Sequence, residues 1–340
     1  MYSARAGKKV STIAEIGMSH DGSLGQAKAF IDAAAETGVD AVKFQTHIAE
    51  AETLKNAPTP PYFTDEPRYE YFKRTAFDLE QHVILKNHAE SKGLEFISSP
   101  FSLEAIELLE KVGVMTYKIP SGEVTNLPLL ERVAKTGKKI LLSSGMSSYS
   151  ELDEAVNTIL RHNKNLVILQ CTSKYPCPFE GVGLNLLEEF KKRYKLPVGL
   201  SDHTPGIYAS LAAVVLGATV IEKHFTISKK LYGPDAKYSL EPHEFKQLVE
   251  GIRAIEAMLE NPVRKDDMAK ELGQMKETFE KSIVSAVDIP AGTVITENLL
   301  TAKKPGGGIP TKDINKVIGK KAKIDIAKDR MIRWGDLVST

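Results

Sequence analysis

The sequence predicts an α/β protein: a (β/α)₈ barrel followed by a small β-rich domain. Short β-branched runs alternate with longer amphipathic segments until about residue 260, which indicates a parallel sheet covered by helices. About eight such repeats over roughly 250 residues is the number expected of an eight-stranded barrel. A doubly wound open sheet is the rival, but no G-x-G-x-x-G follows the first apolar run. We therefore favour the barrel.

The repeats can be assigned one by one from their hydrophobic periodicity. The expected strands are 10–16, 41–45, 95–98, 116–119, 139–143, 166–171, 197–201 and 219–225. The expected helices are 25–37, 80–92, 103–112, 127–135, 151–162, 186–194, 207–216 and 242–259.

The chain changes character after residue 260. Residues 261–281 are polar and charged with no strand signal, and we predict a linker with some helix there. From residue 282 onward, short apolar runs are separated by turn signals at 290–292 and 305–308, which is typical of a small β-rich domain. The predicted organisation is a catalytic barrel at 1–260, a linker at 261–281 and a small domain at 282–340.

Composition excludes several classes of protein. The 340 residues carry 45 Lys and Arg against 44 Asp and Glu, so nothing in the charge favours a nucleic-acid or membrane-surface partner. The two cysteines, Cys171 and Cys177, are too few for a disulfide framework and favour a reducing compartment. The N-terminus has no apolar signal region, and the most apolar stretch, 207–221, is shorter than the roughly 20 residues of a membrane span. We expect a cytoplasmic protein.

The carboxyl ends of the expected strands are unusually polar, and in a barrel these ends carry the chemistry. Side chains alternate along a strand, so Lys43 shares a face with Gln45, Ser201 with His203, and Glu222 with His224. If these faces point inward, lysine, serine, histidine and glutamate side chains converge on one cleft. Two lysines with serines nearby suit a ligand that carries phosphate and carboxylate.

Each residue also has a purely structural interpretation, which spacing alone leaves open. Two histidines at neighbouring strand ends could share a metal or could be ordinary hydrogen-bonded residues. Glu15 and Glu123 could simply pair with lysines, and Asp235 could cap a turn. Cys171 follows an apolar run and is most simply a buried apolar side chain.

Taken together and in order, the strand-end segments resemble the nonulosonic (sialic) acid synthase family. The resemblance extends over nearly the whole chain, because 282–337 looks like the antifreeze-like (SAF) domain of that family. The matching segments are 13–17, 98–101, 117–123, 143–146, 200–204, 221–225 and 233–235, together with Val42-Lys43-Phe44-Gln45.

The resemblance implies a TIM-barrel enzyme that condenses phosphoenolpyruvate with an N-acetylmannosamine-type aldose. The product would be a nine-carbon 2-keto sugar acid, with release of phosphate. It also implies a divalent metal ion, most often Mn²⁺, held by His203 and His224. A homodimer in which each C-terminal domain covers the partner's barrel is implied as well.

Further roles follow by position in the matching motifs. Catalytic roles are implied for Glu15, Glu123, His203, His224 and Asp235. Substrate contacts are implied for Lys43, Gln45, Ser99, Phe101, Lys118, Ser121, Ser143, Ser173, Tyr175, Ser201 and Lys304. Lys304 stands where many bacterial members have an arginine, and lysine lacks the planar fork of a guanidinium. The identity of the sugar therefore stays open between N-acetylmannosamine, its 6-phosphate and a diacetamido sugar.

Two other functions compete with the synthase. A Schiff-base aldolase acting on pyruvate would use Lys118 or Lys43 as its nucleophile, although the paired histidines count against it. A non-catalytic carbohydrate- or ice-binding protein would act through its C-terminal domain, which leaves the polar strand ends unexplained.

Overall fold

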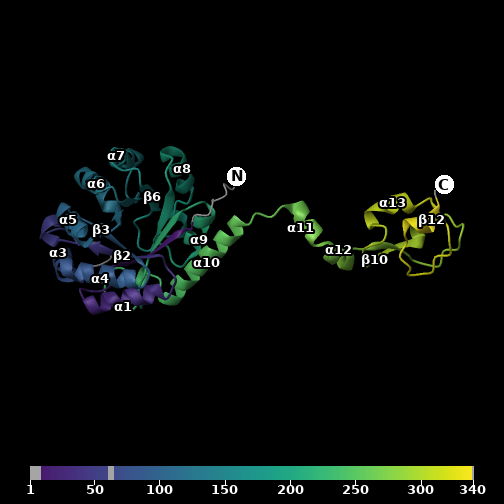
Figure 1. Ribbon diagram of the computed structural model, residues 1–340, viewed down its shortest axis with the longest axis horizontal. Coiled ribbons are helices and arrows are strands. Elements are labelled where there is room, and N and C mark those ends of the chain that lie inside the picture. Colours follow the sequence, from purple (N-terminus) through teal and green to yellow (C-terminus); the bar gives the residue numbers. More distant parts are fainter. Residues whose placement is uncertain (1–8, 60–64, 339–340) are drawn as a thin grey trace. The chain divides into compact units, whose positions relative to one another are not determined.

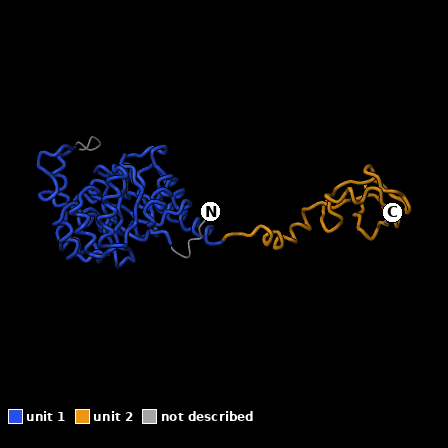
Figure 2. The backbone as a smooth tube through the Cα atoms, turned by 90° about the horizontal axis from the view of Figure 1, so that it is seen from above, with its two compact units in different colours: residues 1–261 blue, residues 262–340 orange. Residues whose placement is uncertain are grey.

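The structure, a computed structural model, describes residues 9–59 and 65–338, and the chain divides into two compact units, residues 1–261 and 262–340 (Figure 2). In the first unit, eight parallel strands close a barrel in the order β1 to β8 (Figure 1), as the alternating pattern predicts. The strands are β1 (Ser11–Gly17), β2 (Ala41–Thr46), β3 (Glu95–Pro100), β4 (Thr116–Ile119), β5 (Lys139–Ser143), β6 (Leu166–Cys171), β7 (Val198–Asp202) and β8 (Val220–His224).

Helices link successive strands and cover the outside of the barrel (Figure 1). Local sequence fixes their ends: Asp78 with Gln81, and Ser148 with Glu151, form capping boxes, and Gly113 ends a helix in the left-handed conformation at φ 77°. The helices are α1 (Leu24–Ala35), α4 (Leu79–Ser91), α5 (Leu103–Val112), α6 (Leu127–Ala134), α7 (Tyr149–Leu160), α8 (Asn185–Tyr194), α9 (Tyr208–Val215) and α10 (Pro242–Glu260).

The interior of the barrel is apolar toward the amino ends of the strands and polar toward their carboxyl ends. A buried cluster that includes Ile13, Ile97 and Leu141 fills the lower part of the lumen. Gly199 belongs to this packing, because a Cβ there would lie 2.5 Å from the Val220 carbonyl oxygen. Nearer the carboxyl ends of the same strands, the inward side chains are charged or hydroxylated, so the polar residues collect at one end of the barrel.

The segment between β2 and α4 contains two helices that the sequence did not predict, α2 (Ala49–Glu52) and α3 (Arg68–Thr75). Both are short, and α3 is rich in charge, so neither shows a clear apolar period. Tyr69 and Tyr71 of α3 are nevertheless buried. This connection lies at the end of the barrel where the strands end, because residues of α3 line the cavity there.

The second unit has its own small core, centred on Ile283, Ile295 and Ile332. Within this unit, the amide of Gly306 donates a 2.7 Å hydrogen bond to the carbonyl of Glu277. The elements of this unit are α11 (Lys265–Glu271), α12 (Gly273–Phe279), β9 (Ser282–Ser285), β10 (Leu300–Lys303), α13 (Ile314–Val317), β11 (Lys321–Ala322) and β12 (Leu337–Val338). Strands β9 and β10 pair antiparallel, as do β11 and β12. The two helices thus occupy the residues predicted as a partly helical linker.

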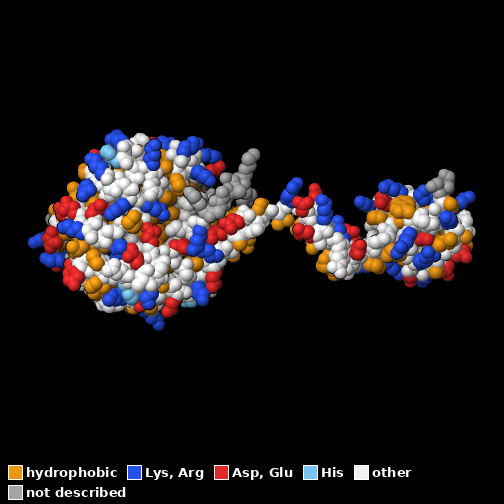
Figure 3. All heavy atoms as spheres, viewed as in Figure 1, with side chains coloured by type: hydrophobic (Ala, Val, Ile, Leu, Met, Phe, Trp, Pro, Cys, Tyr) orange, Lys and Arg blue, Asp and Glu red, His pale blue; other side chains and the backbone are white. Residues whose placement is uncertain are grey.

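The visible surface of each unit mixes basic and acidic side chains, with no large field of one sign (Figure 3). Among the described residues, none of the helices combines the length and the apolar character needed to cross a membrane.

Candidate active site

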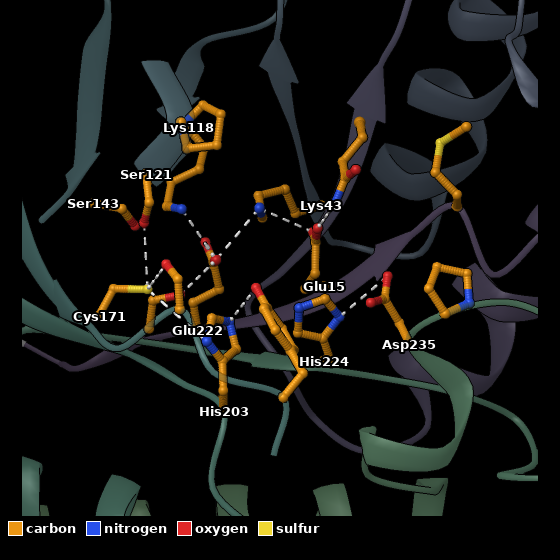
Figure 4. Close-up of a pocket in the computed structure, with 18 of the residues that line it drawn as sticks. Glu15, Lys43, Lys118, Ser121, Ser143, Cys171, His203, Glu222, His224 and Asp235 are labelled. Atoms are coloured by element: carbon orange, nitrogen blue, oxygen red, sulfur yellow. Dashed lines mark hydrogen bonds and ion pairs between the residues drawn. The ribbon is translucent and has the colours of Figure 1, made fainter. Parts of the chain in front are cut away.

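A cavity of ≈ 370 Å³ opens where the barrel strands end, and all but three of the predicted site residues line it (Figure 4). Strand register explains why they meet. Glu15 on β1 lies opposite Lys43 on β2 and also opposite His224 on β8, while Ser201 on β7 lies opposite Glu222. The lining residues among those predicted are Glu15, Lys43, Gln45, Phe101, Lys118, Ser121, Ser143, Ser173, Tyr175, Ser201, His203, His224 and Asp235.

A buried carboxylate, Glu222, holds two buried lysines at the floor of the cavity. The Nζ atoms of Lys43 and Lys118 each lie 3.3 Å from Glu222 Oε1, and Lys43 Nζ lies 3.1 Å from Glu15 Oε2. Ser201 donates a 3.0 Å hydrogen bond to the same Glu222 oxygen. The four charges sum to zero, so the floor is neutral before any ligand enters.

Burial and neighbouring charges give the two lysines different proton affinities. Burial opposes the charge of Lys43, but Glu15 and Glu222 outweigh burial and raise the pKa of that lysine. Burial, helped by the charge of Lys43, lowers the pKa of Lys118 although Glu222 opposes it. Burial disfavours the charge of Glu222 too, but Lys118 and Lys43 lower its pKa to about 2.

Serine hydroxyls surround this floor with spare hydrogen-bonding capacity. The buried Ser143 Oγ has no hydrogen-bond partner within residues 9–59 and 65–338. Gly145 leaves room for two more hydroxyls, because a Cβ there would lie 2.6 Å from Ser173 Oγ and 2.7 Å from Ser121 Oγ. Buried polar atoms normally have partners, so an unpartnered hydroxyl beside two lysines indicates a place for a polar ligand.

The two histidines lie side by side, with ring centroids 5.4 Å apart. His203 Nδ1 lies 2.9 Å from the Thr172 carbonyl, to which it donates, and this leaves Nε2 with its lone pair 3.2 Å from the Tyr175 hydroxyl. His224 Nδ1 is buried without a hydrogen-bond partner in the described part of the chain and lies 3.8 Å from Asp235 Oδ2. Burial lowers the pKa of His224, which favours the neutral imidazole that metals bind.

These features fit a divalent cation, because two available imidazole nitrogens and a carboxylate face one cavity. A second group, Glu241, His243 and Glu244 at the start of α10, has ligand atoms within 4.8 Å of one another. Its two carboxylates already form a capping box and bind Lys229, at 2.9 Å to the amide and 2.6 Å to Nζ. The site at the barrel mouth is therefore the better candidate.

Comparison with known proteins identifies the family. Residues 30–264 match the NeuB family, and residues 280–338 match the SAF domain. The chain belongs to the NeuB family. The predicted family and fold, a barrel followed by an antifreeze-like domain, are thus confirmed.

Two curated relatives and one solved structure show the range of this NeuB-family match. The chain is 41% identical to an N,N'-diacetyllegionaminic acid synthase of Campylobacter jejuni, over 96% of this chain and 99% of the relative. It is 37% identical to the human N-acetylneuraminate-9-phosphate synthase, over 94% and 90%. A crystal structure of N-acetylneuraminic acid synthetase from Leptospira borgpetersenii, in complex with citrate, superposes with a TM-score of 0.70. That match has 31% identity over 78% of this chain and 90% of the other.

Three predicted site residues lie elsewhere than in the cavity lining. Ser99 stands behind it, with its Oγ 3.5 Å from Lys43 Nζ, so it contacts a lining residue. Glu123 accepts a 2.8 Å hydrogen bond from Asn126 and is not a lining residue. Lys304 belongs to the C-terminal unit, where its Nζ lies 5.1 Å from the centroid of the Phe279 ring. Its role at the barrel stays a prediction.

Sequence reasoning missed several lining residues. Glu222 was placed on the inner face but was not assigned a role, although its position two residues before His224 was the available signal. Cys171 is buried as expected, yet it lines the cavity. Burial disfavours its thiolate, but His203 and Lys118 lower the pKa of Cys171 to about 7. The other missed lining residues include Arg68, Tyr71 and Phe72 of α3, for which the long aromatic segment after β2 was the only signal.

Proposed function

We propose that this NeuB-family chain is a cytoplasmic enzyme that condenses phosphoenolpyruvate with the open-chain aldehyde of an N-acetylated amino sugar. Water adds in the same reaction, and the products are a nine-carbon 2-keto sugar acid and phosphate. The observation that carries the proposal is the pair of buried lysines, Lys43 and Lys118, which share one carboxylate beneath a cavity lined with serines. The names of the relatives support it.

The lysines and serines bind the anionic ends of phosphoenolpyruvate. Lys118 Nζ has one ionic partner among the described residues, Glu222, so it can donate further hydrogen bonds to a phosphate or carboxylate oxygen. Ser143 Oγ is free to do the same. Charge-assisted bonds of this kind replace the hydration that the ligand loses on entering a buried site.

Carbon–carbon bond formation then joins C3 of phosphoenolpyruvate to the aldehyde carbon of the sugar. Positive charge develops at C2, and Glu15, with one oxygen 3.1 Å from Lys43 and the other accepting from Gln45, is held in place to stabilise it. Water adds at C2, and phosphate leaves with the bridging oxygen. Glu123 is the second carboxylate that we assign to the reacting carbons or the attacking water.

A divalent cation, which we propose is Mn²⁺, would be held by His203 and His224, and when bound it supplies a Lewis acid for the aldehyde oxygen. Asp235 faces His224 and would orient the sugar or a coordinated water. Tyr175, whose hydroxyl lies 3.2 Å from His203 Nε2, would do the same from the other side. Dialysis against a chelator should abolish activity and Mn²⁺ should restore it; full activity without metal would contradict this assignment.

We further propose a homodimer in which Lys304 of each C-terminal domain reaches the partner's barrel. The test mixes two inactive variants, His203→Ala and Lys304→Ala. If the domains act across the dimer, one of the two sites in a mixed dimer is intact, and refolding the variants together recovers up to about a quarter of the activity. Mixed dimers that form but stay inactive would show that each C-terminal domain serves its own barrel.

Phosphate release tests the proposed reaction directly. The protein, phosphoenolpyruvate and Mn²⁺ are incubated with N-acetylmannosamine, its 6-phosphate or a diacetamido sugar, and we expect phosphate release with at least one acceptor. In ¹⁸O-water, the label should enter C2 of the freshly formed product and not the phosphate. Labelled phosphate without labelled product would show cleavage of the P–O bond instead.

The Schiff-base aldolase makes opposite predictions. The lowered pKa of Lys118 is the one observation in its favour, because a neutral amine is the nucleophile. An aldolase would use pyruvate, tolerate the chelator and be inactivated by borohydride in the presence of pyruvate. We expect none of these three results.

A further inference from the structure

One wall of the cavity takes no part in the binding that we propose for phosphoenolpyruvate. It is formed by α3 and the end of β3, and three of its lining residues are Arg68, Phe72 and Phe101. The rings of Phe72 and Phe101 stack on either side of His47, at centroid distances of 3.8 and 4.1 Å. This wall is therefore preassembled.

His47 is fixed by hydrogen bonds as well as by stacking. Its Nδ1 lies 2.6 Å from Glu52, and its Nε2 lies 3.1 Å from the Gln45 side-chain oxygen. The amide nitrogen of Gln45 in turn donates to Glu15, at 2.7 Å. The stacked wall and the catalytic floor are thus joined by one chain of hydrogen bonds, which holds the wall in a fixed position relative to the reacting atoms.

Arg68 presents to this wall a guanidinium whose Nε is unpartnered among the described residues. Its carbon Cζ lies 5.2 Å from the Phe72 ring centroid, which orients the group. Among the residues that the structure describes, its solvent-shielded Nε has no hydrogen-bond partner and Arg68 has no ion-pair partner. A shielded, unpartnered donor beside the Phe72 ring suits an oxygen acceptor that carries an apolar group.

Charge decides which kind of acceptor fits. Two acidic residues, Glu52 and Glu123, lie near the same wall. Burial raises the pKa of Glu123 and Glu52 raises it further, whereas the hydrogen bond from Asn126 and the charge of Arg68 oppose this. Glu52 is already paired with His47, at 2.6 Å, so the wall offers no excess of positive charge for a phosphate dianion. A neutral amide carbonyl accepts a hydrogen bond from Arg68 and needs no such excess.

We propose that Arg68, with Phe72 and Phe101, binds the second N-acyl group of a diacetamido acceptor, a group that N-acetylmannosamine and its 6-phosphate lack, and that the enzyme therefore prefers a diacetamido sugar to a sugar phosphate. The guanidinium donates to the acyl oxygen, and the rings contact the acyl methyl. The inference rests on the proposed function, because it concerns the second substrate of that reaction. It makes Arg68 a specificity-determining residue.

The test compares KM for the three acceptors in the wild type, Arg68→Met and Arg68→Lys. We expect the lowest wild-type KM with the diacetamido sugar. Arg68→Met should raise that KM by about tenfold or more, because a hydrogen bond to a charged donor is lost. KM for phosphoenolpyruvate should change less than about twofold. Arg68→Lys should restore part of the affinity, and the control Lys73→Met, on the exposed face of α3, should leave all constants unchanged.

Three results would overturn the inference: a selective loss of the 6-phosphate acceptor in Arg68→Met, equal KM values for all acceptors in the wild type, or no effect of Arg68→Met on any acceptor. Thermal melts of both Arg68 variants separate misfolding from lost affinity. If the wild type releases no phosphate with any acceptor, the proposed function itself fails, and that outcome is distinct from an active enzyme that does not need Arg68.

Discussion

Strand β8 carries two adjacent residues, Glu222 and Lys223, that belong to two buried acid–lysine groups on opposite faces of the barrel sheet. The inner group is Glu222 with Lys43 and Lys118, in the cavity. The outer group is Asp202 with Lys223, which points the other way toward α9. Both groups pair a carboxylate with lysine in a buried place, so the contrast isolates what distinguishes a binding site from a structural network.

The outer group is saturated. Asp202 accepts hydrogen bonds from the Thr204 amide at 2.8 Å and from Ser210 at 2.6 Å, and Lys223 Nζ lies 3.0 Å from Asp202 Oδ2 and 2.7 Å from the Thr204 carbonyl. The inner group is not saturated, because Glu222 Oε2 and Ser143 Oγ are buried without hydrogen-bond partners among the described residues. Glu222 Oε2 and Ser143 Oγ thus have spare hydrogen-bonding capacity, which the carboxylate of Asp202 and the ammonium group of Lys223 lack.

The largest expected effect comes from replacing one lysine by methionine in each of the two groups. Lys118→Met should lower kcat/KM for phosphoenolpyruvate about a thousandfold, since two or more charge-assisted bonds are lost, and should change the free energy of unfolding by less than about 1 kcal/mol. Lys223→Met should do the reverse, with about 3 kcal/mol of stability lost because Asp202 is left buried without its cation. Steady-state kinetics and urea unfolding measure both. If the two variants changed kcat/KM equally and changed the free energy of unfolding equally, the inner and outer groups would not differ in function.

The next effect concerns acid stability. The pKa of Glu222 is about 2 in the folded protein against an ordinary 4.5, so its contribution is complete above pH 4.5 and is lost as the pH falls toward 2. The shift corresponds to about 3 kcal/mol. Unfolding free energies of Glu222→Gln should therefore fall less than those of the wild type over this range. Parallel pH profiles for the two proteins would show that the carboxylate is not held ionised by the lysines.

The smallest effect tests the space around the inner hydroxyls. Gly145→Ala would bring a Cβ within 2.7 Å of both Ser121 Oγ and Ser173 Oγ, so these side chains must move. We expect KM for phosphoenolpyruvate to rise by about tenfold, equivalent to the loss of one hydrogen bond. The control Gly25→Ala meets no atom closer than 3.9 Å and should leave KM unchanged. An unaltered KM in Gly145→Ala would remove Ser121 and Ser173 from the binding site.

Much of the fold and of the inner group could be predicted from sequence. Period-two alternation places Lys43, Ser201 and His203 on inward faces, and the barrel rule brings strand ends together. The importance of Glu222 could not be predicted, because it depends on two lysines from β2 and β4 reaching the same oxygen. The contacts between Asp202 and Lys223 could not be predicted either, because they too join residues of different strands.

The wall formed by α3 could not be predicted for a different reason. Arg68 and Phe72 lie on a short helix without apolar periodicity, in a connection whose path depends on packing over the barrel mouth. Glu123 follows a matching strand end, yet it hydrogen-bonds to Asn126 and is not among the residues that line the cavity, so its catalytic role stays a prediction. The positions of side chains at strand ends can thus be predicted from sequence, whereas the positions of those in the connections that follow cannot.

A crystal structure of the protein with phosphoenolpyruvate tests the central claim most directly. The account predicts that the ligand lies in the barrel mouth, with its phosphate and carboxylate oxygens within hydrogen-bond distance of Lys118 Nζ and Ser143 Oγ. The contacts between Asp202 and Lys223 should stay unchanged. A ligand bound elsewhere, or one that reaches the cavity while Ser143 and Lys118 make no contact with it, would contradict the account.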